Sequence, residues 1–251
     1  MTRRHVVVTG AGTGIGRAIA IRLAADGAAV SLLARDDKRL AQTAASLESA
    51  FVASCDIRKR SDVDKAVGKA ADALGPITAL VAASGLGGAN ADGDDDRFDE
   101  LVATNLSGTY YCCRAVLRHL APGPDPRHLV MISSILARIA VPGYTGYSAS
   151  KAGLLGLVRS FAAELAEENI QVNAICPGWV DTDMAWSGLD GIAEADGTTR
   201  EAAYKAAMAD VPLGRMSQPA DIAGTVAWLL SPDARGVTGQ AIDQNGGAWV
   251  G

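Results

Sequence analysis

The chain has 251 residues, of which 49% are hydrophobic and only 5% are aromatic, and it carries a formal net charge of −5. This length is enough for one α/β domain whose core rests mainly on Ala, Val, Leu and Ile. The 28 acidic residues outnumber the 23 basic ones. That balance argues against a nucleic-acid-binding surface, because phosphate binding requires concentrated Lys and Arg.

The start of the chain and its cysteines indicate where the protein works. The first residues reach an apolar strand without the charged and apolar regions of a signal peptide. No apolar run approaches the roughly 20 residues that span a bilayer. Cys55, Cys112, Cys113 and Cys176 show no C-x-x-C spacing, and adjacent cysteines are poorly placed for a disulfide or a zinc site. We therefore expect a cytoplasmic protein with reduced cysteines and with no metal, nucleic-acid or membrane partner.

Short apolar runs alternate with longer amphipathic stretches along the chain. The expected strands are His5–Thr9, Ala29–Ala34, Phe51–Ser54, Ala79–Ala83, Leu129–Ser133, Gln171–Ile175 and Gln240–Asp243. The expected helices include Gly16–Asp26, Asp62–Leu74, Asp99–Leu120 and Tyr147–Glu168. This alternation predicts one α/β domain over residues 1–251, a Rossmann-type, doubly wound and mostly parallel seven-stranded sheet with helices on both faces. Ligands of such sheets bind beyond the carboxyl ends of the strands.

A glycine-rich segment follows the first expected strand directly. Glycines let the backbone approach a pyrophosphate closely, and the helix that follows offers free N–H groups and the positive end of its dipole. Its place between a strand and a helix predicts a dinucleotide loop, and a flexible turn is the alternative. The expected cofactor contacts are Gly10, Thr13, Gly14, Ile15 and Gly16. The spacing T-G-x-x-x-G-x-G, from Thr9 to Gly16, resembles that of the short-chain dehydrogenase/reductase family.

The end of the second expected strand bears on which dinucleotide is bound. An acidic side chain there binds a ribose 2′-hydroxyl, whereas a basic one accepts a 2′-phosphate. Ala34 stands where relatives that prefer NAD usually carry Asp, and Arg35 follows, although Asp36 and Asp37 come next. We therefore favour NADP(H), with Arg35 as the phosphate ligand. Binding of NAD(H), with Arg35 as an ordinary surface residue, is the alternative.

Two features follow the fourth expected strand. The segment Ala82-Ala83-Ser84-Gly85 stands where the family usually has N-N-A-G, whose Asn side chains tie neighbouring strands together and help to position the cofactor. Gly85 still permits a close backbone approach, and the Ser84 hydroxyl is a candidate replacement for part of the hydrogen bonding. The acidic run Asp92–Asp96 lacks the downstream Gly and Glu of an EF-hand loop, so we expect a solvated loop rather than a calcium site.

Tyr147 and Lys151 open a long helical stretch and are four residues apart. Residues at this spacing share one face of a helix. A nearby positive charge favours the phenolate, so we expect Lys151 to lower the pKa of Tyr147. The phenol then acts as a general acid when a ketone is reduced, or as a general base when an alcohol is oxidised. A surface pair without function is the alternative.

Two further polar residues strengthen this interpretation. Ser134 closes a strand thirteen residues before Tyr147, where its hydroxyl is able to stabilise charge on a substrate oxygen. Asn105 lies mid-helix, where Asn is a poor helix former. It is a candidate to hold a water molecule behind the Lys in a proton relay. A plain strand terminator and a tolerated polar position are the respective alternatives.

Asn105, Ser134, Tyr147 and Lys151 match the catalytic tetrad of the short-chain dehydrogenase/reductase family in order and spacing. The resemblance extends from Val6 to the Gly246-Gly247 pair. It implies that Asp56 binds the adenine ring, and that the segment before Thr182 flanks the nicotinamide while Thr182 contacts its carboxamide. The further cofactor contacts implied by the resemblance are Asp56, Ile57, Gly85, Tyr147, Lys151, Pro177, Gly178, Val180 and Thr182.

Residues 183–210 form an insertion that we interpret as a substrate lid. Its candidate apolar lining is Met184, Trp186, Leu189, Ile192, Tyr204 and Met208, although these residues would equally pack a helical pair. A further apolar wall is expected from Leu136, Ile139, Val141 and Tyr144. Arg138 either meets an anionic substrate tail or faces solvent. This lining favours a substrate with a hydrophobic or ring-bearing part.

The second half of the chain looks most similar to 3-oxoacyl thioester and polyketide ketoreductases. We therefore expect NADP(H)-dependent reduction of a ketone, either 3-oxoacyl, polyketide-like or cyclic, to a secondary alcohol. The alternative is an NAD-dependent dehydrogenase of a cyclic or secondary alcohol. A more distant alternative is a non-catalytic dinucleotide sensor, which the intact tetrad argues against. The family resemblance also implies a homo-oligomer, and we expect a tetramer.

Overall fold

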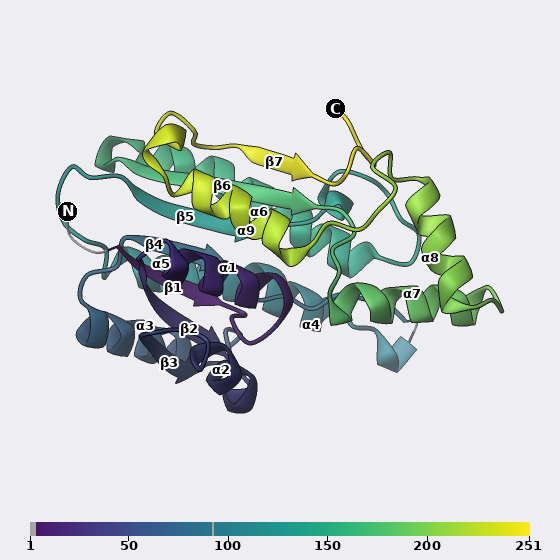
Figure 1. Ribbon diagram of the computed structural model, residues 1–251, viewed down its shortest axis with the longest axis horizontal. Coiled ribbons are helices and arrows are strands. Elements are labelled where there is room, and N and C mark those ends of the chain that lie inside the picture. Colours follow the sequence, from purple (N-terminus) through teal and green to yellow (C-terminus); the bar gives the residue numbers. More distant parts are fainter. Residues whose placement is uncertain (1–3, 92) are drawn as a thin grey trace.

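Seven strands form one sheet in the order β3-β2-β1-β4-β5-β6-β7 (Figure 1). The computed structural model describes residues 4–91 and 93–251. The strands are β1 (His5–Thr9), β2 (Ala29–Ala34), β3 (Ala50–Ser54), β4 (Ala79–Ala82), β5 (Arg127–Ile132), β6 (Ile170–Pro177) and β7 (Ala241–Gln244). Every neighbouring pair is parallel. The doubly wound sheet is confirmed, and it is parallel throughout rather than mostly parallel.

Burial on both faces explains why the central strands are continuous apolar runs. Every residue of β1, β5 and β6 is buried. Along β1, Val6 and Val8 belong to one hydrophobic cluster, and Val7 belongs to the other. Successive side chains of a strand point to opposite faces, so an all-parallel sheet needs apolar residues at both.

Helices cover both faces of the sheet (Figure 1). One face packs against α1 (Gly14–Ala25), α2 (Asp37–Ala44) and α9 (Pro219–Leu229). The other face packs against α3 (Arg60–Leu74), α5 (Thr109–Leu117) and α6 (Thr145–Leu165). The buried residues therefore form two separate clusters, one on each side of the sheet.

The single helix expected at Asp99–Leu120 is interrupted. The helix α4 (Phe98–Val102) leads into a π-helical segment, Ala103–Gly108, before α5 begins. A side chain at Gly108 would bring a Cβ within 2.7 Å of Ile57 Cγ1, so this glycine lets the segment lie against the loop after β3. A π-helical turn holds one residue more than an α-helical turn, and such turns are frequent at functional sites.

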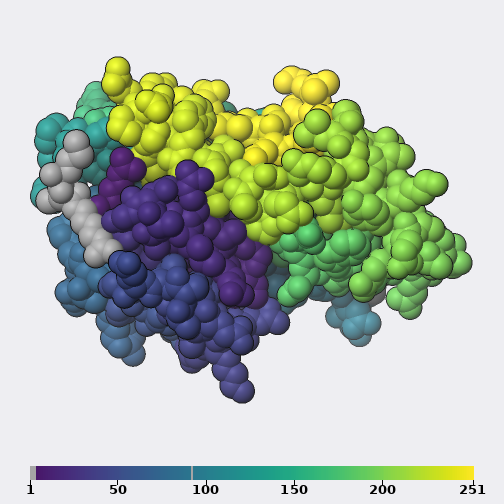
Figure 2. All heavy atoms as spheres, viewed as in Figure 1, coloured from purple at the N-terminus to yellow at the C-terminus, as the bar shows by residue number. Residues whose placement is uncertain are grey.

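The expected lid region folds as two helices, α7 (Asp183–Ala195) and α8 (Arg200–Ala209). Figure 2 shows them, in green, projecting at one end of the molecule. Leu189 and Met208 are buried in a small cluster within the pair, and the rings of Trp186 and Tyr204 stack at a centroid distance of 5.6 Å. Met184, the first residue of the expected lining, is not part of this cluster, and its side chain is exposed.

The remaining expectations concern membranes, cysteines and metals. None of the helices in residues 4–91 and 93–251 combines the length and the apolar character that a bilayer crossing needs. All four cysteines are buried and unpaired. In the same residues, no group of three or more His, Cys, Asp or Glu side chains is placed to hold a metal ion. Asp92 lies outside the described residues, and Asp96 Oδ1 accepts hydrogen bonds from Asn90 Nδ2 and from the Phe98 N–H.

Candidate active site

The expected site residues follow the carboxyl ends of neighbouring parallel strands. The glycine loop follows β1, Gly85 follows β4, Ser134 follows β5, and Pro177 ends β6. Because all these strands are parallel, their carboxyl ends share one edge of the sheet. Residues far apart in the sequence are thereby gathered around the switch point between β1 and β4.

The glycine loop is tightly packed and leaves helix N–H groups uncapped. A Cβ at Gly16 would lie 2.3 Å from Gly10 O, so only glycine fits where the loop closes on itself. Helix α1 starts at Gly14, two residues earlier than expected, and Thr13 makes no side-chain capping bond to it. Free N–H groups and the positive dipole end of a helix bind an anion. The loop therefore fits the pyrophosphate of a dinucleotide.

The segment after β6 reaches back to this loop. Thr182 Cγ2 would lie 3.1 Å from a Cβ at Gly14. Thr182 is held as the N-cap of α7, because its Oγ1 accepts from Ala185 N at 3.3 Å and donates to Val180 O at 3.1 Å. Gly178 packs against Asn245, to whose Cα a Cβ would come within 3.0 Å. Residues expected at the pyrophosphate and at the nicotinamide are thus side by side.

Ser134, Tyr147 and Lys151 converge at the end of β5. Ser134 Oγ accepts a hydrogen bond from Leu136 N at 3.1 Å, and its side chain also hydrogen-bonds with Tyr147. Lys151 Nζ lies 5.7 Å from the centroid of the Tyr147 ring and donates to Ile132 O at 2.9 Å. The hydroxyl, the phenol and the ammonium therefore form one polar group on a buried framework.

The net shift of the Tyr147 pKa is upward, opposite to the lowering that the neighbouring Lys151 led us to expect. Burial raises the pKa of the Tyr147 phenol above its ordinary value, the hydrogen bond from Ser134 opposes this shift, and Tyr144 adds to it. Burial also lowers the pKa of Lys151 to about 8. Desolvation favours the neutral form of any ionisable group. Tyr147 is consequently protonated at neutral pH, the state that a general acid needs.

Asn105 lies in the π-helical segment and is completely buried. Its Oδ1 accepts from Leu86 N at 2.8 Å, and its Nδ2 donates to Leu86 O and to Ser150 Oγ, both at 3.0 Å. A Cβ at Gly85 would lie 3.3 Å from both Asn105 Oδ1 and Lys151 Nζ. The carboxamide therefore ties the loop after β4 to α6, next to the Lys. Both of its N–H donors are used by protein atoms.

Charged side chains surround the ends of β2 and β3. Asp36 Oδ1 caps α2 by accepting from the N–H groups of Lys38 and Arg39. Asp56 is paired with Arg58 at 2.7 Å, and this hydrogen bond is the main cause that lowers the pKa of Asp56 to about 2. Arg35 is exposed and makes no ion pair with any described residue. Its guanidinium is thus available to an anion.

Comparison with known proteins agrees with this geometry. A family model described as enoyl-(acyl carrier protein) reductase matches residues 10–248. The 3-oxoacyl-[acyl-carrier-protein] reductase MabA of Mycobacterium tuberculosis is 32% identical over 253 residues, covering 99% of this chain and 94% of the relative. The chain belongs to the short-chain dehydrogenase/reductase family. It is an NAD(P)-dependent oxidoreductase.

Two further members of the family bind or act on different molecules according to their names. The crystal structure of a variant of actinorhodin polyketide ketoreductase with NADPH matches with a TM-score of 0.92 and 34% identity, covering 98% of this chain and 97% of that one. A glucose 1-dehydrogenase of Gluconobacter oxydans is 32% identical over 251 residues, covering 97% of this chain and 91% of the relative.

This short-chain dehydrogenase/reductase compensates through its backbone for the missing asparagines after β4. The Ser84 N–H donates to Thr9 Oγ1 at 3.2 Å. A Cβ at Gly10 would lie 2.7 Å from Ala83 O, so the two segments touch directly. The link between β1 and β4 thus uses the Thr9 hydroxyl, and the Ser84 hydroxyl is not part of it.

Arg138 is engaged within the protein. Its Nε lies 3.2 Å from Asp243 Oδ1, its Nη2 donates to Ala241 O at 3.1 Å, and its guanidinium lies 5.2 Å from the centroid of the Trp249 ring. It ties the segment after Ser134 to β7 and to the C-terminal residues. Arg138 is therefore held by protein partners and does not simply face solvent.

Several residues that support this site were not predicted from the sequence. Leu86, Asn90 and Ser150 all hydrogen-bond across elements that carry the tetrad. No periodicity or motif marks them, because each partner is distant in sequence.

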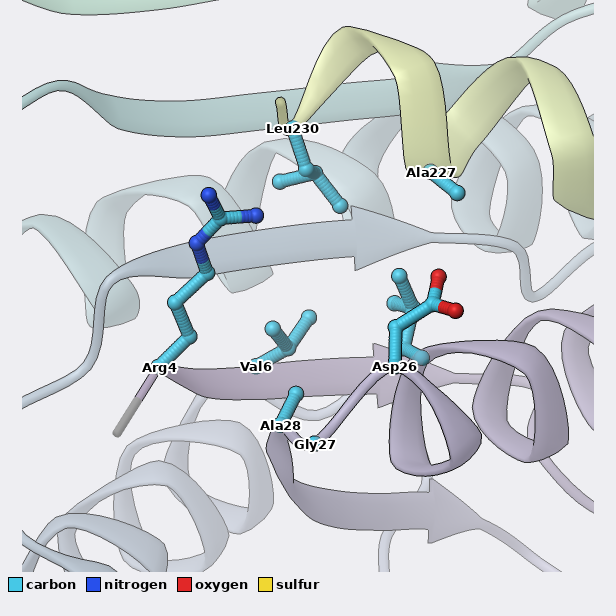
Figure 3. Close-up of a pocket in the computed structure, with 8 residues that line it drawn as sticks. Arg4, Val6, Asp26, Gly27, Ala28, Ala227 and Leu230 are labelled. Carbon is cyan, nitrogen blue, oxygen red and sulfur yellow. The ribbon is translucent and has the colours of Figure 1, made fainter. Parts of the chain in front are cut away.

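A separate pocket of about 250 Å³ lies at the opposite edge of the sheet, near the amino ends of β1 and β2 (Figure 3). Arg4 and Asp26 extend toward α9 on its two sides. Its lining consists of Arg4, Val6, Leu23, Asp26, Gly27, Ala28, Ala227 and Leu230. It contains none of the expected cofactor or tetrad residues.

Proposed function

We propose that this enzyme reduces a ketone to a secondary alcohol with NADPH, and that Tyr147 is the general acid. The observation that carries the proposal is the convergence of the Tyr147 phenol, the Ser134 hydroxyl and the Lys151 ammonium at the end of β5, in a chain similar to proteins named as ketoreductases. NADPH, when bound, supplies a hydride to the carbonyl carbon. The residues that would hold it are Gly10, Thr13, Gly14, Ile15, Gly16, Arg35, Asp56, Ile57, Gly85, Tyr147, Lys151, Pro177, Gly178, Val180 and Thr182.

Each member of the tetrad has a separate task in this proposal. Ser134 Oγ hydrogen-bonds the substrate oxygen, and Tyr147 gives that oxygen its proton as negative charge develops there. The Lys151 ammonium stabilises the phenolate that remains. Asn105 is not free to donate to water, since Leu86 and Ser150 accept both of its donors. Its task is to hold the loop after β4 beside Lys151.

The preference for NADPH over NADH rests on Arg35. Two acidic residues near Arg35 are engaged elsewhere, because Asp36 caps α2 and Asp56 is paired with Arg58. The hydrogen bond from Ser54 Oγ to Arg35 O, at 3.1 Å, fixes the Arg35 backbone at the end of β2. This arrangement supports an exposed guanidinium at the place where a 2′-phosphate would bind.

The substrate side is proposed from apolar residues that remain partly exposed. Leu136, Ile139, Val141 and Tyr144 are half-exposed between Ser134 and α6. Met184 lies against Gly87, where a Cβ would come within 2.9 Å of its Sδ. We propose that the α7–α8 pair covers the substrate beside this wall and that it acts as a lid over an apolar ketone. From the family resemblance we also propose that the protein forms a homotetramer and that it works in the cytoplasm.

The test measures absorbance of reduced nicotinamide with NADPH and NADH against 3-oxoacyl thioesters and cyclic ketones. We expect NADPH oxidation with one substrate class. We expect Tyr147→Phe to lower kcat at least about a hundredfold with cofactor affinity kept. Tyr111→Phe, which removes a phenol from α5, is the matched control and should change neither quantity.

Three outcomes would contradict parts of the proposal. Near-normal turnover by Tyr147→Phe would remove this residue from its role. Turnover with NADH alone would reject Arg35 as a phosphate ligand and would favour a dehydrogenase of a cyclic alcohol, an activity that the name of the glucose 1-dehydrogenase relative supports. Tight cofactor binding without turnover on the whole panel would favour a dinucleotide sensor.

A further inference from the structure

The helix that carries Tyr147 and Lys151 does not cap its own first turn. Tyr144 is the N-cap of α6 and makes no side-chain hydrogen bond to it. The first helical bond runs from Ser148 N to Tyr144 O at 2.8 Å. The N–H groups that precede Ser148 in the first turn therefore have no acceptor within the helix.

Asn90, from the loop after β4, supplies the missing acceptor. Its Oδ1 accepts from Gly146 N at 2.8 Å and from Thr145 Oγ1 at 3.3 Å. The backbone N–H of Asn90 donates to Gly143 O at 2.7 Å. A Cβ at Gly146 would lie 3.1 Å from both Asn90 Oδ1 and Nδ2, so the glycine admits the carboxamide at close range. The residue next to Gly146 is Tyr147.

The same loop also reaches the rest of the tetrad. A Cβ at Gly85 would lie 3.3 Å from both Asn105 Oδ1 and Lys151 Nζ, and Leu86 exchanges two hydrogen bonds with Asn105. Residues 85–90 thus run from the buried carboxamide of the π-helical segment to the first turn of α6. A displacement of this loop would therefore move the surroundings of both Asn105 and Tyr147.

We propose that Asn90 is a positioning residue that fixes the first turn of α6 and, through it, the Tyr147 hydroxyl relative to Ser134. The inference rests on the proposed function, in which Tyr147 is the acid. Asn90 touches neither the phenol nor the reacting atoms, so it acts only through the helix.

The chemistry of the pair Asn90 and Asp96 makes the proposal specific. Asn90 needs an acceptor toward α6 and a donor toward Asp96, whose Oδ1 accepts from Nδ2 at 2.6 Å. In Asn90→Asp, an acceptor toward α6 remains, but two carboxylates then face each other. The double variant Asn90→Asp/Asp96→Asn exchanges donor and acceptor and restores the hydrogen bond between the two positions.

The test compares Asn90→Ala, Asn90→Asp and the double variant with the wild type. Steady-state kinetics and NADPH affinity are measured, and amide hydrogen exchange of the first turn of α6 is followed in the cofactor-free protein. We expect Asn90→Ala and Asn90→Asp to lower kcat about tenfold and to speed exchange at Gly146 about tenfold, with NADPH affinity kept within about twofold. The double variant should recover both kcat and protection.

Asp95→Asn is the matched control, because it removes an exposed carboxylate from the same loop and Asp95 makes no hydrogen bond to α6. It should behave as the wild type. The proposal fails if Asn90→Ala keeps wild-type kcat, or if the double variant recovers neither readout. A parallel Tyr147→Phe variant separates the two hypotheses. Its normal turnover would sink the proposed function, whereas its inactivity beside a normal Asn90→Ala would sink only the role of Asn90.

Discussion

Tyr147 and Lys151 share one face of α6, and loss of contact with water shifts the pKa of each side chain toward its neutral form. The pKa of the Tyr147 phenol rises, so the proton stays on. The pKa of the Lys151 ammonium falls to about 8, so its charge is lost just above neutral pH. The lower of these two pKa values belongs to the lysine, and it therefore sets the alkaline limit of a site that needs a protonated Lys151.

At this residue scale we expect kcat/KM for NADPH to fall as the pH rises through about 8, where Lys151 loses its charge. The pH profile of kcat/KM reports groups of the free enzyme, which suits a pKa that belongs to the cofactor-free protein. In Lys151→Arg, whose guanidinium stays protonated, whatever activity remains should show no decline near pH 8. A wild-type profile that stays flat to pH 10 would contradict the assignment.

Spacing predicted the tetrad, but it indicated neither the direction of the Tyr147 pKa shift nor the residues that support the tetrad. The i, i+4 relation of Tyr147 and Lys151 follows from helix geometry alone. The direction of a pKa shift depends on how much protein surrounds the group, which sequence does not display. Asn90 and Arg138 have partners that lie far away in the sequence, so no local pattern marks them.

At the scale of elements, the close contact inside the glycine loop depends on one missing side chain. Gly16 lies in the first turn of α1, where an added Cβ would lie 2.3 Å from Gly10 O. We expect Gly16→Ala to lower the free energy of unfolding by about 2 kcal/mol or more, because the obstacle is backbone that has to move. Cofactor affinity should fall with it.

The matched control is Gly191→Ala in α7, where nothing lies within 4 Å of the added Cβ. Alanine is the better helix former, so we expect this variant to be more stable by about 0.5–1 kcal/mol. Urea unfolding of both variants measures the difference. Equal effects of the two substitutions would show that crowding at Gly10 is unimportant.

Element boundaries were predicted well where one pattern dominated. The strands β1 and β2 have the bounds expected from their apolar runs, whereas α1 begins two residues early, since the glycine pattern conceals the start of the helix. The break between α4 and α5 was not predicted, because the π-helical segment is defined by backbone bonds and by the partners of Asn105. Apolar periodicity alone does not distinguish it from a continuous helix.

At the scale of the whole molecule, the two edges of the parallel sheet carry different groups. The carboxyl edge carries the candidate site, and the opposite edge carries two buried histidines. His5 Nδ1 lies 2.8 Å from Gly75 O and its Nε2 lies 2.8 Å from Ser31 Oγ. Burial lowers the pKa of His5, and it lowers the pKa of His128 to about 4, with the charge of Arg4 as a second cause.

We expect the protein to lose stability as the pH falls from about 6.5 toward 4, since the unfolded chain takes up protons that the folded chain does not. Above the ordinary histidine pKa the contribution of His128 is complete, on the order of 3 kcal/mol, and below about pH 4 it is gone. Urea midpoints at pH 7 and pH 5 measure the loss. His128→Gln should reduce the difference between them, and an unchanged difference would reject His128 as its source.

The π-helical segment Ala103–Gly108 also fixes the number of residues between Phe98 and Leu117. A π-helical turn holds one residue more than an α-helical turn, so deleting one residue there would restore a continuous α-helix and keep Cys112 and Val116 buried, but it would take Asn105 out of the turn that places its carboxamide. A descendant that lost one codon there would therefore lose the hydrogen bonds of Asn105 to Leu86 and Ser150. The connection between α7 and α8 bears no such constraint. Length changes in descendants of this chain are therefore expected in that connection and not beside Asn105.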